Sequence, residues 1–205
     1  MYTTLLFNES PIISIIVVGA IAAMAKCKSN VGIVVFMLIL VMLMAFYRYE
    51  PHGRQYDNNT IVSPASGLVT YAKQRGKLIH ISIYLNVFNN HTQIYPVNGV
   101  VVDRVYDETG KFDLVNDMDK SRDNEKKIHT IKMKNNNFVK ITQIAGFFPR
   151  RIVSSNKVPE CVMAGAYLGM IKFGSRVDLV FPGDISKLRI KCNDKISLGD
   201  IIYIY

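Results

Sequence analysis

The sequence predicts a mainly β fold, a compact antiparallel barrel or sandwich, preceded by an N-terminal hydrophobic helical membrane anchor. Three observations support this. Two uncharged apolar runs hold nearly all the excess hydrophobicity and lie within residues 11–48. From residue 61 onward, short segments that alternate apolar and polar residues are separated by Gly, Asn and Asp turns. That part contains no long amphipathic helical pattern, and its length suffices for one domain with a real core.

The two apolar runs differ in length. A spanning helix needs about 20 apolar residues, with about 17 as a lower limit. Residues 31–46 reach that limit with the flanking Tyr47, whereas residues 11–25 fall short. Residues 1–10 contain no Lys or Arg, which argues against a secretory signal peptide. We therefore interpret residues 1–48 as an anchor: a short hairpin, or one span preceded by an interfacial or re-entrant segment. The alternative is a buried hairpin, which the second run disfavours because it has no polar face.

Basic residues flank the second run on both sides. Lys26 and Lys28 precede it, and Arg48, His52 and Arg54 follow it. The positive-inside rule cannot place both groups in the cytoplasm if both runs span. A hairpin that dips in from one side removes the conflict and gives a cytoplasm-facing domain close to lipid headgroups. The net charge of +9 is compatible with an anionic membrane surface, nucleic acid or acidic small substrates.

The domain predicted from residue 49 to residue 205 consists of strands and turns. Residues 49–60 are a polar linker with Pro51 and Gly53. The predicted elements after it are, in order, strand–turn–strand over 61–73 with Ser66-Gly67 at the tip, a strand at 77–86, a turn at Asn98-Gly99 that indicates a local hairpin into a strand ending at 106, a polar excursion over 107–127, a hairpin over 129–146 with Asn135, Asn136 and Asn137 at its tip, and strands within 158–173, 175–182 and 187–205.

Motifs of several function classes are absent or incomplete. The four histidines have no metal-ligand spacing, so the sequence predicts no metal site. Gly110-Lys111 lacks the earlier glycine of a phosphate-binding loop, and Ser175 lacks the second glycine of a nucleophile elbow. Basic residues between 120 and 140 alternate with acids and asparagines without aromatics. That pattern indicates a solvated face and no nucleic-acid partner.

The dipeptide Gly174-Ser175 carries more specific chemistry. It interrupts residues 171–180, which otherwise alternate like a buried strand in a central ladder, and glycine weakens a strand unless the backbone must bend there. A serine hydroxyl can attack the preceding carbonyl carbon, and glycine removes the Cβ that would obstruct it. Elimination from the ester then cuts the chain, and the residue left from Ser175 becomes a pyruvoyl group. That group forms a Schiff base with an amine and withdraws electrons for decarboxylation.

The surroundings of this dipeptide resemble the phosphatidylserine decarboxylase family, in its short membrane-anchored branch. The resemblance covers nearly the whole chain in order, and its motifs are specific only when taken together. The segments that carry it are QIAGFFPRRIV (143–153), GMIKFGSRVDLVFP (169–182), IVSPASGLVTYAK (61–73), ISIYLNVFNNHTQIYPVNGVV (81–101) and GKFDLVNDMDKSRDNEKK (110–127).

This resemblance implies a proenzyme of phospholipid biosynthesis that cuts itself between Gly174 and Ser175. Residues 1–174 would become a β chain, and residues 175–205 an α chain that begins with a covalent pyruvoyl cofactor derived from Ser175. The enzyme would be a carboxy-lyase. The amine of membrane phosphatidylserine would form the Schiff base, and loss of carbon dioxide would leave phosphatidylethanolamine. The positive net charge suits an anionic lipid.

The resemblance also implies roles for three further residues. His91 stands at the histidine position of the matched strand and could protonate the carbanion after decarboxylation, since imidazole titrates near neutral pH. The alternative is a turn histidine beside a strand end. Arg150 and Arg151 could hold the headgroup phosphate or carboxylate through a bidentate fork, and the alternative for them is a surface pair.

One departure from the family pattern stands out. Ser66 occupies the place of the usual aspartate in Ala65-Ser66-Gly67, and Ile94 occupies the place of the second histidine that this aspartate assists in longer relatives. A serine cannot orient or charge-stabilise a base as a carboxylate does. The departure leaves open slow maturation, recruitment of another group such as His91, or failure of self-cleavage. The last of these would give a catalytically silent, membrane-tethered lipid-binding β domain. The sequence also leaves open a decarboxylase of another serine phospholipid, and a homo-oligomer.

Overall fold

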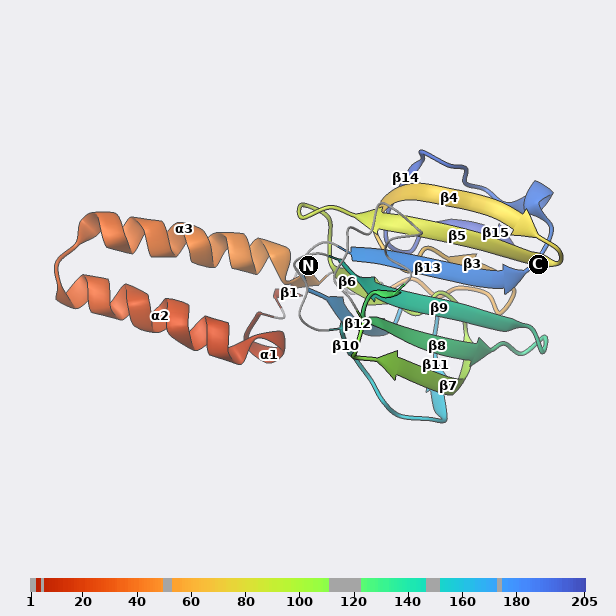
Figure 1. Ribbon diagram of the computed structural model, residues 1–205, viewed down its shortest axis with the longest axis horizontal. Helices are drawn as coiled ribbons and strands as arrows, with labels where there is room; N and C mark the ends of the chain where they lie inside the picture. The colour runs from red at the N-terminus through yellow and green to blue at the C-terminus, as the bar shows by residue number, and fades with distance from the viewer. Residues whose placement is uncertain (1–2, 5, 50–52, 111–122, 147–151, 173–174) are drawn as a thin grey trace. The chain divides into compact units, whose positions relative to one another are not determined.

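A computed structural model describes residues 3–4, 6–49, 53–110, 123–146, 152–172 and 175–205. The chain divides into two compact units, Met1–Glu50 and Pro51–Tyr205. In the described residues the first unit is mainly helical and the second is mainly β, and all the paired strands are antiparallel (Figure 1). The mainly β fold with antiparallel sheets is confirmed.

The first unit is a pair of packed helices. Its elements are β1 (Thr3–Thr4), α1 (Leu6–Glu9), α2 (Pro11–Lys26), α3 (Asn30–Phe46) and β2 (Arg48–Tyr49). Pro11 stands in the first turn of α2, where the absent N–H is not needed. The Ser29 side chain caps α3 by accepting from the Gly32 backbone N–H at 3.3 Å. A Cβ on Gly32 would lie 2.7 Å from Met24 Sδ, so the absence of a side chain there lets the helices approach.

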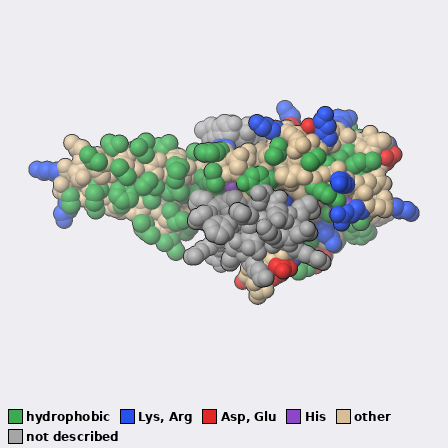
Figure 2. Space-filling model, turned by 45° about the horizontal axis from the view of Figure 1, so that its top comes forward, with side chains coloured by type: hydrophobic (Ala, Val, Ile, Leu, Met, Phe, Trp, Pro, Cys, Tyr) green, Lys and Arg blue, Asp and Glu red, His purple; other side chains and the backbone are tan. Residues whose placement is uncertain are grey.

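Apolar side chains cover the outside of these helices. Figure 2 shows hydrophobic side chains spread over the visible face of the helical unit. Ile12, Val31 and Leu38 are each more than three-fifths exposed. Helix α2 has 16 residues and α3 has 17. Within the described part of the chain, no helix is both long enough and apolar enough to cross a membrane.

In its described residues, the second unit contains one large sheet and two small ones. The eight-stranded sheet has the order β11-β7-β8-β9-β13-β5-β4-β14, the three-stranded sheet has the order β10-β12-β6, and β15 pairs with β3. Figure 1 shows β4, β5, β13, β9, β8 and β7 side by side. The bounds are β3 (Thr60–Val62), β4 (Gly67–Arg75), β5 (Leu78–Leu85), β6 (Thr92–Ile94), β7 (Gly99–Asp107), β8 (Lys126–Lys132), β9 (Phe138–Ala145), β10 (Ile152–Ser154), β11 (Glu160–Val162), β12 (Tyr167–Ile171), β13 (Ser175–Pro182), the short 3-10 helix η2 (Ile185–Lys187), β14 (Lys195–Ile196) and β15 (Ile201–Ile204).

The core lies on one face of the large sheet. Strand β13 alternates so that Val177, Leu179 and Phe181 are fully buried in the core cluster. Their neighbours across the ladder include Ile83 and Ile81 of β5, which are also buried. Burying each large aliphatic or aromatic side chain contributes about 1.5–3 kcal/mol relative to leaving it exposed. This shared apolar face fixes the register of β13 between its two neighbours.

Of three local predictions, one is confirmed and two differ from the structure. The hairpin over 129–146 is confirmed as β8 and β9, with Asn136 at a positive φ in the turn. The hairpin predicted at Asn98-Gly99 is wrong, because β6 pairs with β12 and β7 pairs with β8 and β11. Residues 171–180 do not form one ladder either: β12 ends at Ile171 in the small sheet, and β13 begins at Ser175 in the large one.

Candidate active site

Two crossovers between the large and the small sheet define the site. One runs from β5 to β6 and the other from β12 to β13. The end of β5 pairs with the start of β13, and the end of β12 pairs with the start of β6. Each crossover therefore begins beside the strand end at which the other one finishes. The first crossover ends with His91, and the second ends at Ser175. Residues far apart in the sequence are therefore brought to the same place between the two sheets.

Ser175 is the first residue of β13 and lies between two strands. It is paired with Leu85 of β5 and with Ala145 of β9. It is fully buried and lies in the same alternation as Val177, which faces the core. Its Oγ has no hydrogen-bond partner among the described residues. A buried hydroxyl without a partner costs about 1–3 kcal/mol. This unpartnered hydroxyl at a strand terminus makes Ser175 a candidate for a chemical role.

His91 is fully buried at the start of β6. Its Nδ1 lies 2.9 Å from the backbone oxygen of Asn89. A carbonyl oxygen only accepts, so Nδ1 carries a proton and, in the neutral ring, Nε2 is the basic nitrogen. The backbone oxygen of His91 accepts from the N–H of Ile171 at 3.3 Å. This contact ties His91 to the last residue of β12, at the beginning of the crossover that leads to Ser175.

A buried chain of hydrogen bonds extends from His91 across the large sheet. Gln93 Nε2 donates to the backbone oxygen of His91 at 2.7 Å, and Gln143 Nε2 donates to Gln93 Oε1 at 2.9 Å. His129 Nε2 lies 3.1 Å from Gln143 Oε1, and Arg104 Nε donates to His129 Nδ1 at 2.9 Å. Because Arg104 can only donate, Nδ1 is the acceptor and Nε2 carries the proton. The donors and acceptors thus run in one direction from Arg104 to His91.

The far end of this chain is an ionic cluster. Arg104 Nη2 forms an ion pair with Glu160 and also donates to the Tyr95 hydroxyl at 2.8 Å. Burial would raise the pKa of Glu160, but hydrogen bonds from Arg104 and Tyr95 outweigh it and lower that pKa. Burial also raises the pKa of Tyr95 to about 12, so its hydroxyl keeps its proton and donates to Glu160 at 3.1 Å. The cluster fixes the Arg104 guanidinium that orients His129.

Burial lowers the pKa of His129 to about 4. The nearby charges of Arg104 and Lys127 lower it further, while the hydrogen bond with Gln143 opposes the shift. The ring is therefore neutral at physiological pH, which the donor from Arg104 also requires. Sequence reasoning missed this network. The available signal was a set of polar residues, Gln93, His129 and Gln143, at positions where the strand alternation predicts buried side chains.

Arg176 follows Ser175 on the opposite face of β13. It is 4% exposed, and its Nε lies 2.9 Å from Asp178 Oδ1. Burial raises the pKa of Asp178, and the charge of Arg176 opposes that effect. An ion pair on this face secures the start of β13 without contributing a charge to the face on which Ser175 lies.

Several predicted site residues cannot be placed. Gly174, Arg150 and Arg151 lie outside the described residues. Ser66 and Ile94 are the two positions that depart from the family pattern. The Ile94 N–H donates to the oxygen of Pro64, two residues before Ser66, at 3.1 Å. Ser66 Oγ accepts from the Leu198 N–H at 2.8 Å, and Ile94 is fully buried.

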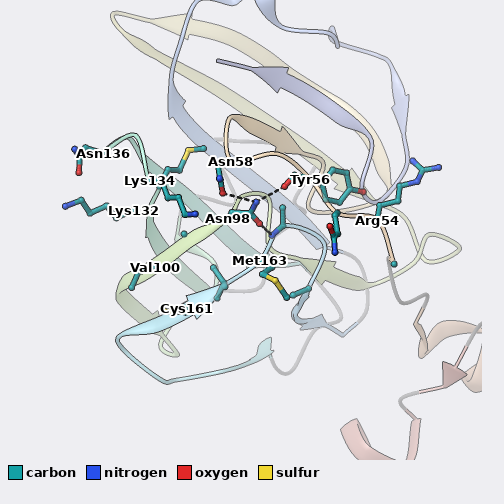
Figure 3. A pocket seen from close by; sticks show the side chains of 17 residues that line it. Arg54, Tyr56, Asn58, Asn98, Val100, Lys132, Lys134, Asn136, Cys161 and Met163 are labelled. Atoms are coloured by element: carbon teal, nitrogen blue, oxygen red, sulfur yellow. Dashed lines mark hydrogen bonds between the residues drawn. The ribbon is translucent and has the colours of Figure 1, made fainter.

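A separate cavity of about 930 Å³ lies away from Ser175. Figure 3 shows Asn98 and Tyr56 at its wall, together with Lys132, Lys134 and Arg54. Its lining includes the Lys132 end of β8, which pairs with the Phe138 end of β9, whereas Ser175 is paired with Ala145 at the opposite end of β9. The cavity is therefore distinct from the candidate site at Ser175, despite its size. Within the described residues, no cluster of His, Cys, Asp and Glu could hold a metal ion.

Comparison with known proteins finds one family. A profile of the family described as "Phosphatidylserine decarboxylase" matches residues 42–203. A protein named "Phosphatidylserine decarboxylase proenzyme" from Geotalea uraniireducens is 33% identical over 82% of this chain and 80% of its own length. Proteins of the same name from Solibacter usitatus and Ralstonia nicotianae are 35% and 34% identical, over 80% and 79% of this chain and 80% and 77% of their own lengths.

Proposed function

The chain belongs to the phosphatidylserine decarboxylase family, and on that premise we propose that it is a proenzyme which converts phosphatidylserine to phosphatidylethanolamine and carbon dioxide. One observation carries the assignment to this chain's own residues. Ser175, the serine of the Gly-Ser dipeptide, is fully buried at a crossover between sheets with an unpartnered Oγ, and His91 ends the neighbouring crossover.

Ser175 begins the reaction by cutting its own chain. Its Oγ attacks the carbonyl carbon of Gly174, the C–N bond breaks, and an ester joins Gly174 to the Ser175 side chain. Loss of the Ser175 α-proton then expels the Gly174 carboxylate and leaves a dehydroalanine at residue 175. Addition of water and release of ammonia convert that residue to a pyruvoyl group. Residues 1–174 and 175–205 are the two products.

The fold keeps the two products together. Strand β13 is hydrogen-bonded on both sides, to β5 from Ser175 to Pro182 and to β9 from Ser175 to Val180. After the cut, residues 175–205 also retain the pairings of β14 with β4 and of β15 with β3. The smaller product is therefore held by strand pairing and by the shared core, and the new N-terminus stays at the site.

The position of Ser175 suits a small uncharged group. It is buried between Leu85 and Ala145. Its Oγ has no hydrogen-bond partner among the described residues, so converting Ser175 to a pyruvoyl group breaks no such hydrogen bond. When present, a pyruvoyl group supplies a carbonyl that binds the substrate amine and accepts the electron pair released with carbon dioxide.

His91 is the proposed general acid. Its Nδ1 proton is held by the Asn89 oxygen, so Nε2 is the nitrogen without a proton. Nε2 takes the proton that the substrate ammonium group must lose before it can attack, and gives that proton to the substrate carbon after carbon dioxide leaves. Arg150 and Arg151 are proposed to bind the headgroup phosphate or carboxylate through their forked donors. Arg150→Lys and Arg151→Lys, which keep the charge and remove the fork, should raise KM.

The helical unit is proposed to attach the chain to the membrane. Helices α2 and α3 are apolar on all sides, and such a surface is stable when lipid covers it. A 17-residue helix is about 25 Å long, less than the roughly 30 Å of a bilayer core. We therefore favour a hairpin that enters from one side, with residues 49–205 as the decarboxylase domain facing the cytoplasm.

The test is release of carbon dioxide from phosphatidylserine labelled at the serine carboxyl. The wild-type chain in phospholipid vesicles should release the label, and the Ser175→Ala chain should not. A matched variant, Ser186→Ala in the exposed η2, should behave as wild type. No release by a correctly folded wild-type chain would favour a silent lipid-binding domain, and release by Ser175→Ala would refute the assigned chemistry.

A further inference from the structure

The loop that joins β5 to β6, residues 86–90, carries two exposed apolar side chains. Phe88 is 85% exposed, the most exposed of the large hydrophobic side chains in the described residues, and Val87 is 55% exposed. Single exposed hydrophobic residues are common on protein surfaces. Here two adjacent ones occupy the tip of a loop at the candidate site, which requires a more specific explanation.

Hydrogen bonds hold this loop in a defined shape. Asn86 Oδ1 accepts from the N–H groups of Phe88 and Asn89, at 2.9 and 3.2 Å. In return, Asn89 Oδ1 accepts from the Asn86 N–H at 2.9 Å. The side-chain oxygens of the two asparagines thus accept hydrogen bonds from three backbone N–H groups of the turn. Val87 and Phe88 point outward from a preformed loop, and displaying them costs little additional ordering.

The same loop is joined directly to the reacting groups. Leu85, immediately before it, is paired with Ser175. Asn89, within it, holds Nδ1 of His91 through its backbone oxygen at 2.9 Å. Asn90 is buried, and its Oδ1 accepts from the Thr92 hydroxyl at 2.7 Å. The apolar tip is therefore separated from His91 only by a short, hydrogen-bonded stretch of chain.

We propose that Val87 and Phe88 insert into the phospholipid bilayer that holds the substrate, and that this loop seats the mouth of the site on the membrane surface. The inference rests on the proposed function. A phosphatidylserine headgroup must reach the buried Ser175 and His91 while its acyl chains remain in the bilayer. An apolar tip beside the site keeps that path short, since an aromatic ring is stabilised when it leaves water for the lipid interface. The net charge of +9 favours an anionic bilayer as the occupant.

A fluorescence measurement tests this directly, because the chain contains no tryptophan. Phe88→Trp places a single reporter at the loop. Phe138→Trp is the matched control, since Phe138 is 51% exposed and lies at the end of β9 away from Ser175. Both full-length chains are bound to vesicles of phosphatidylcholine and phosphatidylserine with brominated acyl chains. Emission of the Phe88→Trp chain should shift to the blue and be quenched, and emission of the control should do neither.

The result that overturns the proposal is equal quenching of both reporters, or none at position 88. Because the emission does not depend on turnover, this outcome is separate from failure of the proposed decarboxylation. As a second measurement, Phe88→Ser should slow decarboxylation in vesicles about 10- to 100-fold, the effect of removing one large buried apolar side chain. Phe138→Ser should not slow it. An unchanged rate in Phe88→Ser, with self-cleavage intact by mass, would also refute insertion.

Discussion

The pH dependence of folding should report the buried state of His129. Burial lowers the pKa of this ring from the ordinary 6.5 to about 4 in the folded chain. The unfolded chain therefore binds a proton between these two pKa values that the folded chain does not. Stability contributed by the neutral ring is complete above pH 6.5, is lost as the pH falls toward 4, and does not decrease further below that value.

The magnitude follows from the size of the shift. Each pKa unit corresponds to about 1.4 kcal/mol, so the shift of His129 makes folding about 3 kcal/mol less favourable at pH 4 than at neutral pH. That is a large share of a typical domain stability of about 5–15 kcal/mol. The geometry explains the cost: a protonated Nδ1 would turn a donor toward Arg104 Nε, which lies 2.9 Å away and cannot accept.

The assay is urea unfolding of the Ser175→Ala chain in detergent, followed across this pH range, with and without His129→Gln. The glutamine cannot titrate, although its amide oxygen and nitrogen can still accept and donate. Other groups, including His80, whose pKa burial also lowers, titrate in both chains and cancel in the comparison. The parent should lose about 3 kcal/mol more than His129→Gln on acidification. Equal losses in the two chains would refute the assignment of a neutral, buried His129.

Three further changes probe the packing and the chemistry of the site. Gly169→Ala should destabilise the chain by about 1–3 kcal/mol in thermal unfolding, because a Cβ there would lie 2.2 Å from a backbone oxygen of β10. The control Gly53→Ala, whose Cβ would have no atom nearby, should not change the stability. Equal effects of the two substitutions would contradict this packing. His91→Gln should leave self-cleavage intact and slow decarboxylation about 100-fold, as loss of a general acid does. A rate of decarboxylation near that of the wild type would mean that His91 is a turn histidine only. Ser66→Asp alone should leave the rate of self-cleavage within about twofold, since Ile94 stands where longer relatives have the second histidine and offers no base to orient. Marked acceleration in a time course would show that a carboxylate there assists another residue.

Local patterns predicted the elements better than their partners. The β8–β9 hairpin was predictable because the alternation on both sides of three asparagines is a short-range signal. The pairing of β6 with β12 was not, because it joins segments separated by many residues and β6 has only Thr92 to Ile94 to show a pattern. For the same reason, residues 171–180 read as one strand, although alternation cannot show that the chain changes sheets before Ser175.

A candidate site could be proposed from the sequence where the chemistry resides in neighbouring residues. Gly174 and Ser175 are adjacent, and the reaction between them requires only that adjacency and a bend in the backbone. The hydrogen-bond chain from Arg104 to His91 joins four strands, so no short stretch of sequence contains it. Its members are distinguished only by polarity at buried positions, which indicates an unusual core without naming the partner of each group.

Intact-mass measurement of the purified chain under denaturing conditions tests the central claim most directly. The account predicts two fragments for the wild type, residues 1–174 and residues 175–205, the second with a mass that corresponds to a pyruvoyl group in place of Ser175. The Ser175→Ala chain should remain a single species of 23.2 kDa. A wild-type chain that stays intact after prolonged incubation, or a fragment that begins with an unmodified serine at position 175, would contradict the account.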